Sequence, residues 1–533
     1  MYRPFVVQYF VISWLLLSSF HYPASEAAIL KAASFKHYID SFDANDDELY
    51  VQHIPNAQSW SFLEENIPLL DSPDKQIEQT YYFRWWTYRK HIEKTPEGFV
   101  VTEFLPNVPW SGKYNTISAA AAHHIYEGRW LADRQYMRDY ARFWLSGSGS
   151  PRSYSFWIAD ALFNYYQVTL DKELITSLFP RLVRNYDAWE KENLDANGLF
   201  WQEDGKDGME VSICGALSEG ALGYRATINS YMYGDAIAIS RIARLVNQPK
   251  IADRFASKAR AIKSKVQQTL WDGRADFFKV LPRGKDRLCD ARELHGYTPW
   301  YFNMPDEQYS KAWKYLMDPH YFFAKYGPTT AEQNYRDFKI SYEGHECQWN
   351  GPSWPYATSI TLTAAANLLN NYSQQYFSGK DYFTLLKIYT GSQLRTREDG
   401  RVVPWIDENL NPLTGDWIAR TRLNSWDNGS WSQEKGGRER GKDYNHSTYG
   451  DLIITGLIGL RPRGDNTLVI NPLVPAGVWD YFCLDNIRYH GKTIAVLYDR
   501  TGKRYRKGKG FMVFVDGEKK FSSAVVKMIE IVL

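Results

Sequence analysis

Apolar residues recur at intervals of three and four along most of the chain between residues 77 and 459. Because this spacing gathers them on one face of an α-helix, it predicts a mainly helical protein. The predicted helices lie near residues 77–93, 115–126, 130–145, 152–168, 171–192, 226–246, 250–270, 305–317, 352–370, 379–396 and 446–459. Loops of unequal length, many of them rich in Gly, Trp, Asp and Glu, separate these segments.

Roughly a dozen helices in consecutive hairpins suit a closed ring of helix pairs better than a bundle. The sequence has no repeat of fixed period, which argues against the ordinary repeat families. We therefore expect a mainly α fold, an (α/α)6 toroid barrel, over residues 76–462. The long loops on one side of such a ring are where a functional site is expected.

The pattern changes on both sides of the predicted barrel. Residues 28–75 are polar and contain Pro55, Pro68 and Pro73, which predicts an irregular lead-in that lies over the barrel. Between residues 463 and 533, short apolar runs are separated by Gly and Asp turns and predict a small C-terminal β domain. The apolar residues 524–533 have no assigned role in this prediction.

The first residues have the layout of a targeting segment. A single early charge, Arg3, precedes an apolar run from Phe5 to Phe20, and small residues follow. We interpret residues 1–27 as a signal peptide cleaved near Ala27, which predicts a secreted or periplasmic protein. The run is shorter than the roughly 20 residues that span a bilayer, so we expect no membrane span after cleavage.

Composition narrows the possible functions. Lys plus Arg (63) nearly equals Asp plus Glu (61), so no long-range field favours nucleic acid as a partner. Aromatic residues make up 16% of the chain and include 20 Trp, whose flat faces suit both a thick core and a cavity that stacks sugar rings. The four cysteines lack CxxC spacing, so we expect no zinc site, and they are either thiols or one or two disulfides.

Cleavage of a glycosidic bond needs one carboxyl group that protonates the leaving oxygen and a second carboxylate. Two glycine-containing, aromatic loops carry suitable acids, the first with Asp207 and Glu210 and the second with Glu408. The apolar neighbours of Glu210 favour a raised pKa, as a proton donor requires. The alternative is that these acids only solvate exposed turns.

Three motifs resemble, in the same order, those of glycoside hydrolase family 63 and the related mannosylglycerate hydrolases. Asn197-Gly-Leu with Asp207-Gly-Met-Glu-Val-Ser212 is similar to the family's NGL and SGMDNS stretches. The stretch from Trp349 to Pro355 is similar to WRGPIWP, and that from Glu408 to Gly415 is similar to ExYDPxTG. The resemblance spans most of residues 80–460. It implies an (α/α)6 barrel, Glu210 as general acid, Glu408 as general base and inversion at the anomeric carbon.

The chain departs from this family at the acid. Glu210 stands where the family has aspartate and Val211 where it has asparagine, so Asp207 is a second candidate for the acid. The chain also resembles barrel enzymes such as glycoside hydrolase family 142, which remove terminal arabinofuranose from plant pectin. Glucosides, mannosides and arabinofuranosides are therefore all candidate substrates, as terminal sugars of an oligosaccharide or polysaccharide.

Candidate substrate-binding residues come from the same loops and from the first predicted helix. They offer aromatic faces or hydrogen-bonding groups, and core packing or helix capping is the alternative role of each. The candidates are Arg84, Trp85, Trp86, Glu103, Trp110, Trp201, Arg225, Asn229, Trp349, Asn350, Trp354, Trp405 and His446.

Three other functions compete with a hydrolase. Tyr444 and His446 suit a polysaccharide lyase on an α/α toroid, although a lyase needs basic groups for uronates and these loops are acidic. A non-catalytic glycan-binding protein on the same scaffold is the second alternative. The run from Gly344 to Cys347 offers too few ligands for metal catalysis, so we expect neither metal nor cofactor. The sequence leaves the oligomeric state open.

Overall fold

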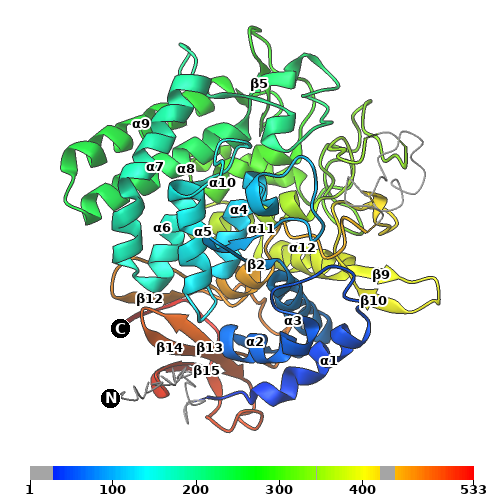
Figure 1. Cartoon of the computed structure of the whole chain (residues 1–533), viewed down its shortest axis with the longest axis vertical. Coiled ribbons are helices and arrows are strands. Elements are labelled where there is room, and N and C mark those ends of the chain that lie inside the picture. The colour runs from blue at the N-terminus through cyan, green and yellow to red at the C-terminus, as the bar shows by residue number, and fades with distance from the viewer. Residues whose placement is uncertain (1–27, 344, 420–438) are drawn as a thin grey trace, which may run out of the picture.

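The computed structural model describes residues 28–343, 345–419 and 439–533, so the predicted signal peptide lies outside the described residues. The mainly helical (α/α) toroid is confirmed (Figure 1). Its helices are α3 (Lys75–Lys90), α4 (Ser118–Gly128), α5 (Gln135–Ser146), α6 (Ile158–Thr169), α7 (Lys172–Asn193), α8 (Ala226–Leu245), α9 (Pro249–Thr269), α10 (Thr298–Tyr301), α11 (Pro355–Asn371) and α12 (Gly379–Ser392). A 3-10 helix (Glu307–Tyr315) and a π-helix (Leu452–Leu457) complete the ring.

The α8–α9 hairpin shows how the sequence produces a ring with inner and outer helices. Helix α8 is buried over most of its surface, as expected of an inner helix. Its partner α9 buries only the stripe Ala252, Phe255, Ala259, Ile262 and Val266, whose spacing of three and four marks an outer helix with one solvated face. Burial of these apolar faces against each other is what holds the hairpin together.

The C-terminal region folds as two antiparallel sheets below the helices (Figure 1). Its strands are β11 (Leu460–Arg461), β12 (Thr467–Ile470), β13 (Tyr481–Tyr489), β14 (Lys492–Asp499), β15 (Gly510–Val515), β16 (Glu518–Ser523) and β17 (Ile529–Val532). Strand β17 pairs with β12, with Ile529 opposite Ile470. The apolar residues at the C-terminus therefore form a sheet strand.

The lead-in is more regular than the sequence indicated. It contains α1 (Lys36–Ala44), α2 (Ser59–Asn66) and β1 (Leu69–Asp71), so the expectation of an irregular segment was wrong. The prolines lie between these elements, where a missing N–H costs nothing. Strand β1 pairs with β13, with Leu70 opposite Leu484, so the lead-in completes the edge of the C-terminal sheet.

Short two-stranded hairpins and one three-stranded sheet, in the order β4-β5-β8, decorate the helical ring. They comprise β2 (Ile92–Thr95), β3 (Gly98–Val101), β4 (Trp201–Glu203), β5 (Leu222–Tyr224), β6 (Trp271–Asp272), β7 (Phe277–Phe278), β8 (Leu281–Pro282), β9 (Leu394–Thr396) and β10 (Val402–Pro404). None of the described helices is long and apolar enough to cross a bilayer. All four cysteines are free thiols.

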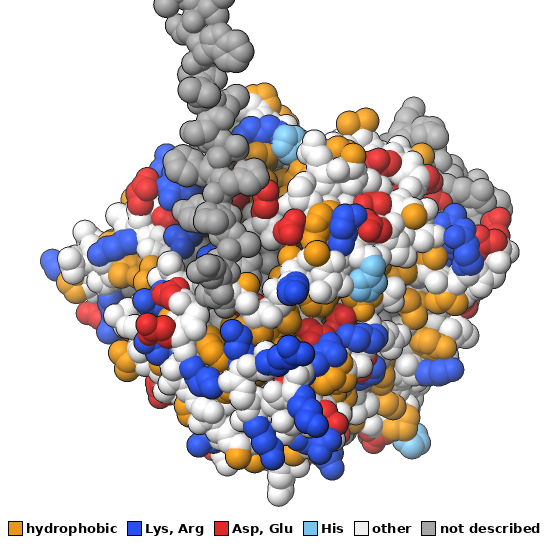
Figure 2. Space-filling view, turned by 90° about the horizontal axis from the view of Figure 1, so that it is seen from below, with side chains coloured by type: hydrophobic (Ala, Val, Ile, Leu, Met, Phe, Trp, Pro, Cys, Tyr) orange, Lys and Arg blue, Asp and Glu red, His pale blue; other side chains and the backbone are white. Residues whose placement is uncertain are grey.

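The face below the helices carries basic side chains interspersed with acidic and apolar ones (Figure 2). Part of the basic run near the C-terminus is neutralised within the fold, because the Arg504 guanidinium donates to the Asp71 carboxylate at 2.9 Å. This ion pair joins β1 to the loop after β14.

Strand β1 gives the first prediction. Leu70 is fully buried between the β domain and α3, so Leu70→Ala should lower the free energy of unfolding by about 2–5 kcal/mol. Leu49→Ala is the control, because Leu49 is 53% exposed and its truncation should change stability by no more than about 0.5 kcal/mol. Denaturant unfolding measures both, and equal losses would contradict the role given to β1.

Candidate active site

A cavity of about 270 Å³ lies among loops that lead into α4, α8 and α11. Side chains from distant parts of the sequence converge on it, which is what the ring of helices makes possible. The lining residues are Glu103, Phe104, Trp110, Ile117, Ala119, Ala120, Tyr154, Gly208, Glu210, His345, Glu346, Cys347, Trp349, Trp354, Tyr356, Glu408, Arg440, Tyr444 and His446.

Residues 346–354, which we call the bridging loop, hold the two acidic loops in place. The Trp349 amide donates to the Val211 carbonyl at 2.8 Å, which fixes the backbone directly after Glu210. On the other side, Ser353 and Leu410 exchange two backbone hydrogen bonds of 2.9 Å, directly after Glu408. The predicted acid and base are thus positioned by one loop that contacts both.

Glu210 faces the cavity and Asp207 does not. Burial, together with the nearby charge of Glu408, raises the pKa of Glu210 to about 8. Asp207 lies outside the lining and its carboxylate accepts a hydrogen bond from the Thr227 hydroxyl. Of the two candidates for the acid, the geometry favours Glu210.

Glu408 lies beside a buried arginine. The Arg440 guanidinium is 3.4 Å from the Glu408 carboxylate and donates to Glu346 at 2.6 Å. Burial raises the pKa of Glu408 to about 7, while the positive charge of Arg440 opposes a larger rise. Glu408 is therefore partly ionised at neutral pH, whereas Glu210 is mostly protonated.

Glu103 brings a further carboxyl group to the cavity. Burial raises its pKa to about 8, although the Tyr444 hydroxyl donates a hydrogen bond to it. The ring centroids of His446 and Tyr444 are 4.0 Å apart. Burial depresses the pKa of His446 well below its ordinary value. At neutral pH this side of the cavity therefore offers a neutral acid and a neutral imidazole.

Tryptophans form one wall of the cavity. Trp349 and Trp354 stack with ring centroids 4.3 Å apart and an interplanar angle of 12°. The indole N–H of Trp354 donates to the Gln348 carbonyl at 2.7 Å, which fixes the ring. Trp110, 38% exposed, also lines the cavity, with the Arg440 guanidinium 5.1 Å from its ring centroid. Flat apolar faces beside carboxyl groups suit a sugar ring.

Several predicted binding residues have other partners and lie outside the lining. Arg84 bonds to Tyr389, Gln393 and Ser447, and thereby ties α3 to α12 and to the segment before the π-helix. Trp85 is fully buried in the core. The prediction that Arg84 and Trp85 bind substrate was misleading because inner helices of a ring are buried on nearly every face, so their aromatic and polar side chains pack inside the protein.

Other predicted binding residues form hydrogen bonds with the backbone that leads into the loop of Glu210. Arg225 donates to the Gln202 carbonyl at 2.7 Å, and Asn229 bonds to both backbone groups of Phe200. Trp201 and Asn350 also lie outside the lining. The Arg283 guanidinium is 4.0 Å from the centroid of the Trp201 ring, and the Asn350 side chain donates to the Asp337 carbonyl.

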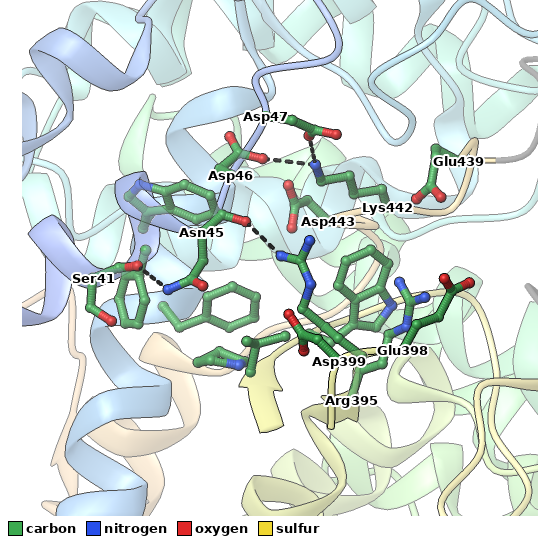
Figure 3. A pocket seen from close by; sticks show the side chains of 17 residues that line it. Ser41, Asn45, Asp46, Asp47, Arg395, Glu398, Asp399, Glu439, Lys442 and Asp443 are labelled. Atoms are coloured by element: carbon green, nitrogen blue, oxygen red, sulfur yellow. Dashed lines mark hydrogen bonds and ion pairs between the residues drawn. The ribbon is translucent and has the colours of Figure 1, made fainter. Parts of the chain in front are cut away.

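Trp86 and Trp405 line a different cavity, of about 430 Å³ (Figure 3). Of the predicted binding residues, those that line the smaller cavity are Glu103, Trp110, Trp349, Trp354 and His446. Sequence reasoning missed Arg440, Glu346, Tyr154 and Tyr356 as cavity residues. The available signal for Arg440 was its place just before Tyr444 and His446, which the sequence had already offered as candidate lyase residues.

Comparison with known families agrees with this geometry. The family model described as "Mannosylglycerate hydrolase MGH1-like glycoside hydrolase domain" matches residues 113–447, which carry most of the cavity lining. The chain belongs to this family of glycoside hydrolases. The model described as "Glycosyl hydrolase family 65, C-terminal domain" matches residues 460–520 of this family member, within the β domain.

Solved structures similar to this chain include a protein named "Sialidase", with 43% identity and a TM-score of 0.87 over 95% of this chain. The chain spans 45% of the length of that protein. A family 78 rhamnosidase of Bacillus sp. GL1 has 11% identity and a TM-score of 0.54 over 81% of this chain and 40% of its own. A family 63 mannosylglycerate hydrolase from Thermus thermophilus has 10% identity and a TM-score of 0.47, over 65% of this chain and 100% of its own.

The buried carboxyl groups of this MGH1-like domain predict a pH dependence of stability. The pKa values of Glu103 and Glu210 rise from an ordinary 4.5 to about 8, so between these limits the folded protein binds protons that the unfolded chain releases. The free energy of unfolding should therefore decrease as pH rises through this window, by about 1.4 kcal/mol per pH unit for each group.

Glu103→Gln should flatten this dependence, because the amide oxygen still accepts from Tyr444 and no longer titrates. Glu203→Gln, in an exposed position, is the matched control and should leave the slope unchanged. Unfolding curves between pH 5.5 and 8.5 measure the effect, and a rise in stability with pH would contradict it.

Proposed function

We propose that the chain is an inverting glycoside hydrolase that removes a terminal sugar, with Glu210 as general acid and Glu408 as general base. The observation that carries this proposal is that both glutamates face one small cavity with a tryptophan wall. Their environments differ in the way that the two roles require, since only Glu408 lies beside a cation.

The reaction follows from these two environments. Glu210, protonated near neutral pH, donates its proton to the oxygen of the leaving group as the glycosidic bond breaks. Ionised Glu408 takes a proton from a water molecule, whose oxygen forms the new bond to the anomeric carbon from the opposite face. The product then has inverted configuration, and both carboxyl groups return to their starting state by proton exchange with solvent.

The size of the cavity supports action at a chain end. Its volume of about 270 Å³ lies just below the range of typical ligand sites, roughly 300 to 1,000 Å³. A cavity of this size suits one sugar ring rather than the interior of a polymer. Exo action on a terminal residue is therefore the mode that we propose.

The charges in the cavity support a neutral sugar. Among the described lining residues, Arg440 is the one arginine or lysine, and Glu346 and Glu408 already neutralise it. Glu103 and Glu210 are protonated near neutral pH and supply no positive charge, so a carboxylate on the sugar would find no described lysine or arginine left to pair with it. Mannosides, glucosides and arabinofuranosides meet this condition, whereas a sialic acid, the substrate class implied by the name of the 43% identical protein, does not.

A lyase is less well supported. The Tyr444 hydroxyl is engaged by Glu103, and the cavity has no uncommitted arginine or lysine among the described residues for a uronate carboxylate. A lyase would release unsaturated products that absorb in the ultraviolet. A non-catalytic glycan-binding protein would show binding without turnover.

The catalytic assignment predicts large losses for two substitutions. Glu210→Gln and Glu408→Gln should each lower kcat by about 10²- to 10⁴-fold on the best substrate of a neutral-glycoside panel. Glu203→Gln, in an exposed position of the Glu210 loop, should keep full activity. NMR of the first product anomer should show inversion, and a retained configuration would overturn the mechanism.

Arg440 gives a second prediction as a positioning residue. Its charge lowers the pKa of Glu408, so Arg440→Met should raise that pKa and move the acidic limb of kcat/KM to higher pH by about one unit or more. Arg440→Lys should partly restore the limb because it keeps the charge. An unchanged limb in a folded Arg440→Met variant would show that Arg440 does not set the ionisation of Glu408.

A further inference from the structure

We propose that the larger cavity of Figure 3 is a second carbohydrate-binding site, which holds another part of a neutral glycan while the smaller cavity cleaves it. The cavity measures about 430 Å³ and lies between the end of α1, helix α3, the β9–β10 hairpin and residues 439–443. It shares none of its lining residues with the smaller cavity. The inference rests on the proposed function only for the expectation that the glycan is also the substrate.

The same two chain segments contribute lining residues to both cavities. In residues 404–408, Pro404 and Trp405 line the larger cavity and Glu408 lines the smaller one. In residues 439–446, Lys442 faces the larger cavity and Arg440 the smaller one. A glycan in the larger cavity is thus held close to the base and to the arginine that pairs with it.

The apolar part of the larger cavity is aromatic. The rings of Phe42, Phe83 and Trp86 contact one another with centroids 5.5 to 6.0 Å apart. Trp405 also lines the cavity, with the Arg395 guanidinium 4.6 Å from its ring centroid. Aromatic rings next to hydrogen-bonding side chains are the chemistry that carbohydrate sites use.

The charges around this cavity favour a neutral ligand over a phosphate or other anion. Lys442 is 2.8 Å from Asp46 and also bonds to Asp47, as Figure 3 shows. Lys90, just behind, pairs with Asp46 at 2.9 Å and with Asp443 at 2.5 Å. Acidic side chains outnumber basic ones in the lining, so sugar hydroxyl groups, which donate to carboxylates, fit better than an anion.

Ser41→Trp tests the site because Ser41 is an exposed lining residue on α1, and a bulky ring there should fill the cavity. Ala44→Trp is the matched control, since Ala44 is exposed on the same helix and outside the lining. With the Glu210→Gln background to prevent turnover, retention on soluble neutral polysaccharides, arabinan and mannan, is measured by affinity electrophoresis. We expect Ser41→Trp to weaken retention at least fivefold and Ala44→Trp to leave it unchanged.

Kinetics of the active chain give an independent readout. Ser41→Trp should raise KM for the polysaccharide at least fivefold and leave kcat and KM for a small aryl glycoside unchanged. Equal retention and equal KM in Ser41→Trp and Ala44→Trp would overturn the second site, as would retention on polygalacturonate in place of the neutral polymers. Absence of turnover on every glycoside would contradict the proposed function. The retention assay would still show whether the larger cavity binds a glycan.

Discussion

The arrangement of the proposed acid and base depends on the backbone hydrogen bonds of the bridging loop. Glu210 and Glu408 are about two hundred residues apart, and neither lies within a regular helix or strand. The bridging loop contacts the residue after Glu210 through Trp349 and the segment after Glu408 through Ser353. Backbone bonds of this kind are independent of side-chain identity, so they tie the two acidic loops together without using the motif side chains.

Burial and one cation then divide the roles between similar side chains. Glutamates share one ordinary pKa, and burial alone would raise them together. Arg440 breaks this equivalence because it lies beside Glu408 and Glu346 and has no such contact with Glu210. The same pairing leaves no uncommitted lysine or arginine among the described lining residues, which is the basis for proposing a neutral sugar as the substrate.

The sequence predicted the helical ring well because its apolar periodicity reports directly on which helix faces are buried. It predicted the acidic loops through motif resemblance, and the structure brings Glu210, Glu408, Glu103 and three of the predicted tryptophans together. It failed for Arg84, Arg225 and Asn229, since a polar side chain that satisfies buried backbone groups has the same local signature as one that binds a ligand. It missed Arg440 because that residue acts through contacts made only in three dimensions.

The pairing of β1 with β13 has a consequence for how the chain reaches its folded state. The amides of Ile29 and Leu30 bond to Asp485, more than 450 residues away along the chain. During synthesis this contact can form only after Asp485 has been made, 455 residues after Leu30. Until then the apolar side chains of β1 lack their final cover, and the early helices of the ring have to assemble next to an incomplete neighbour.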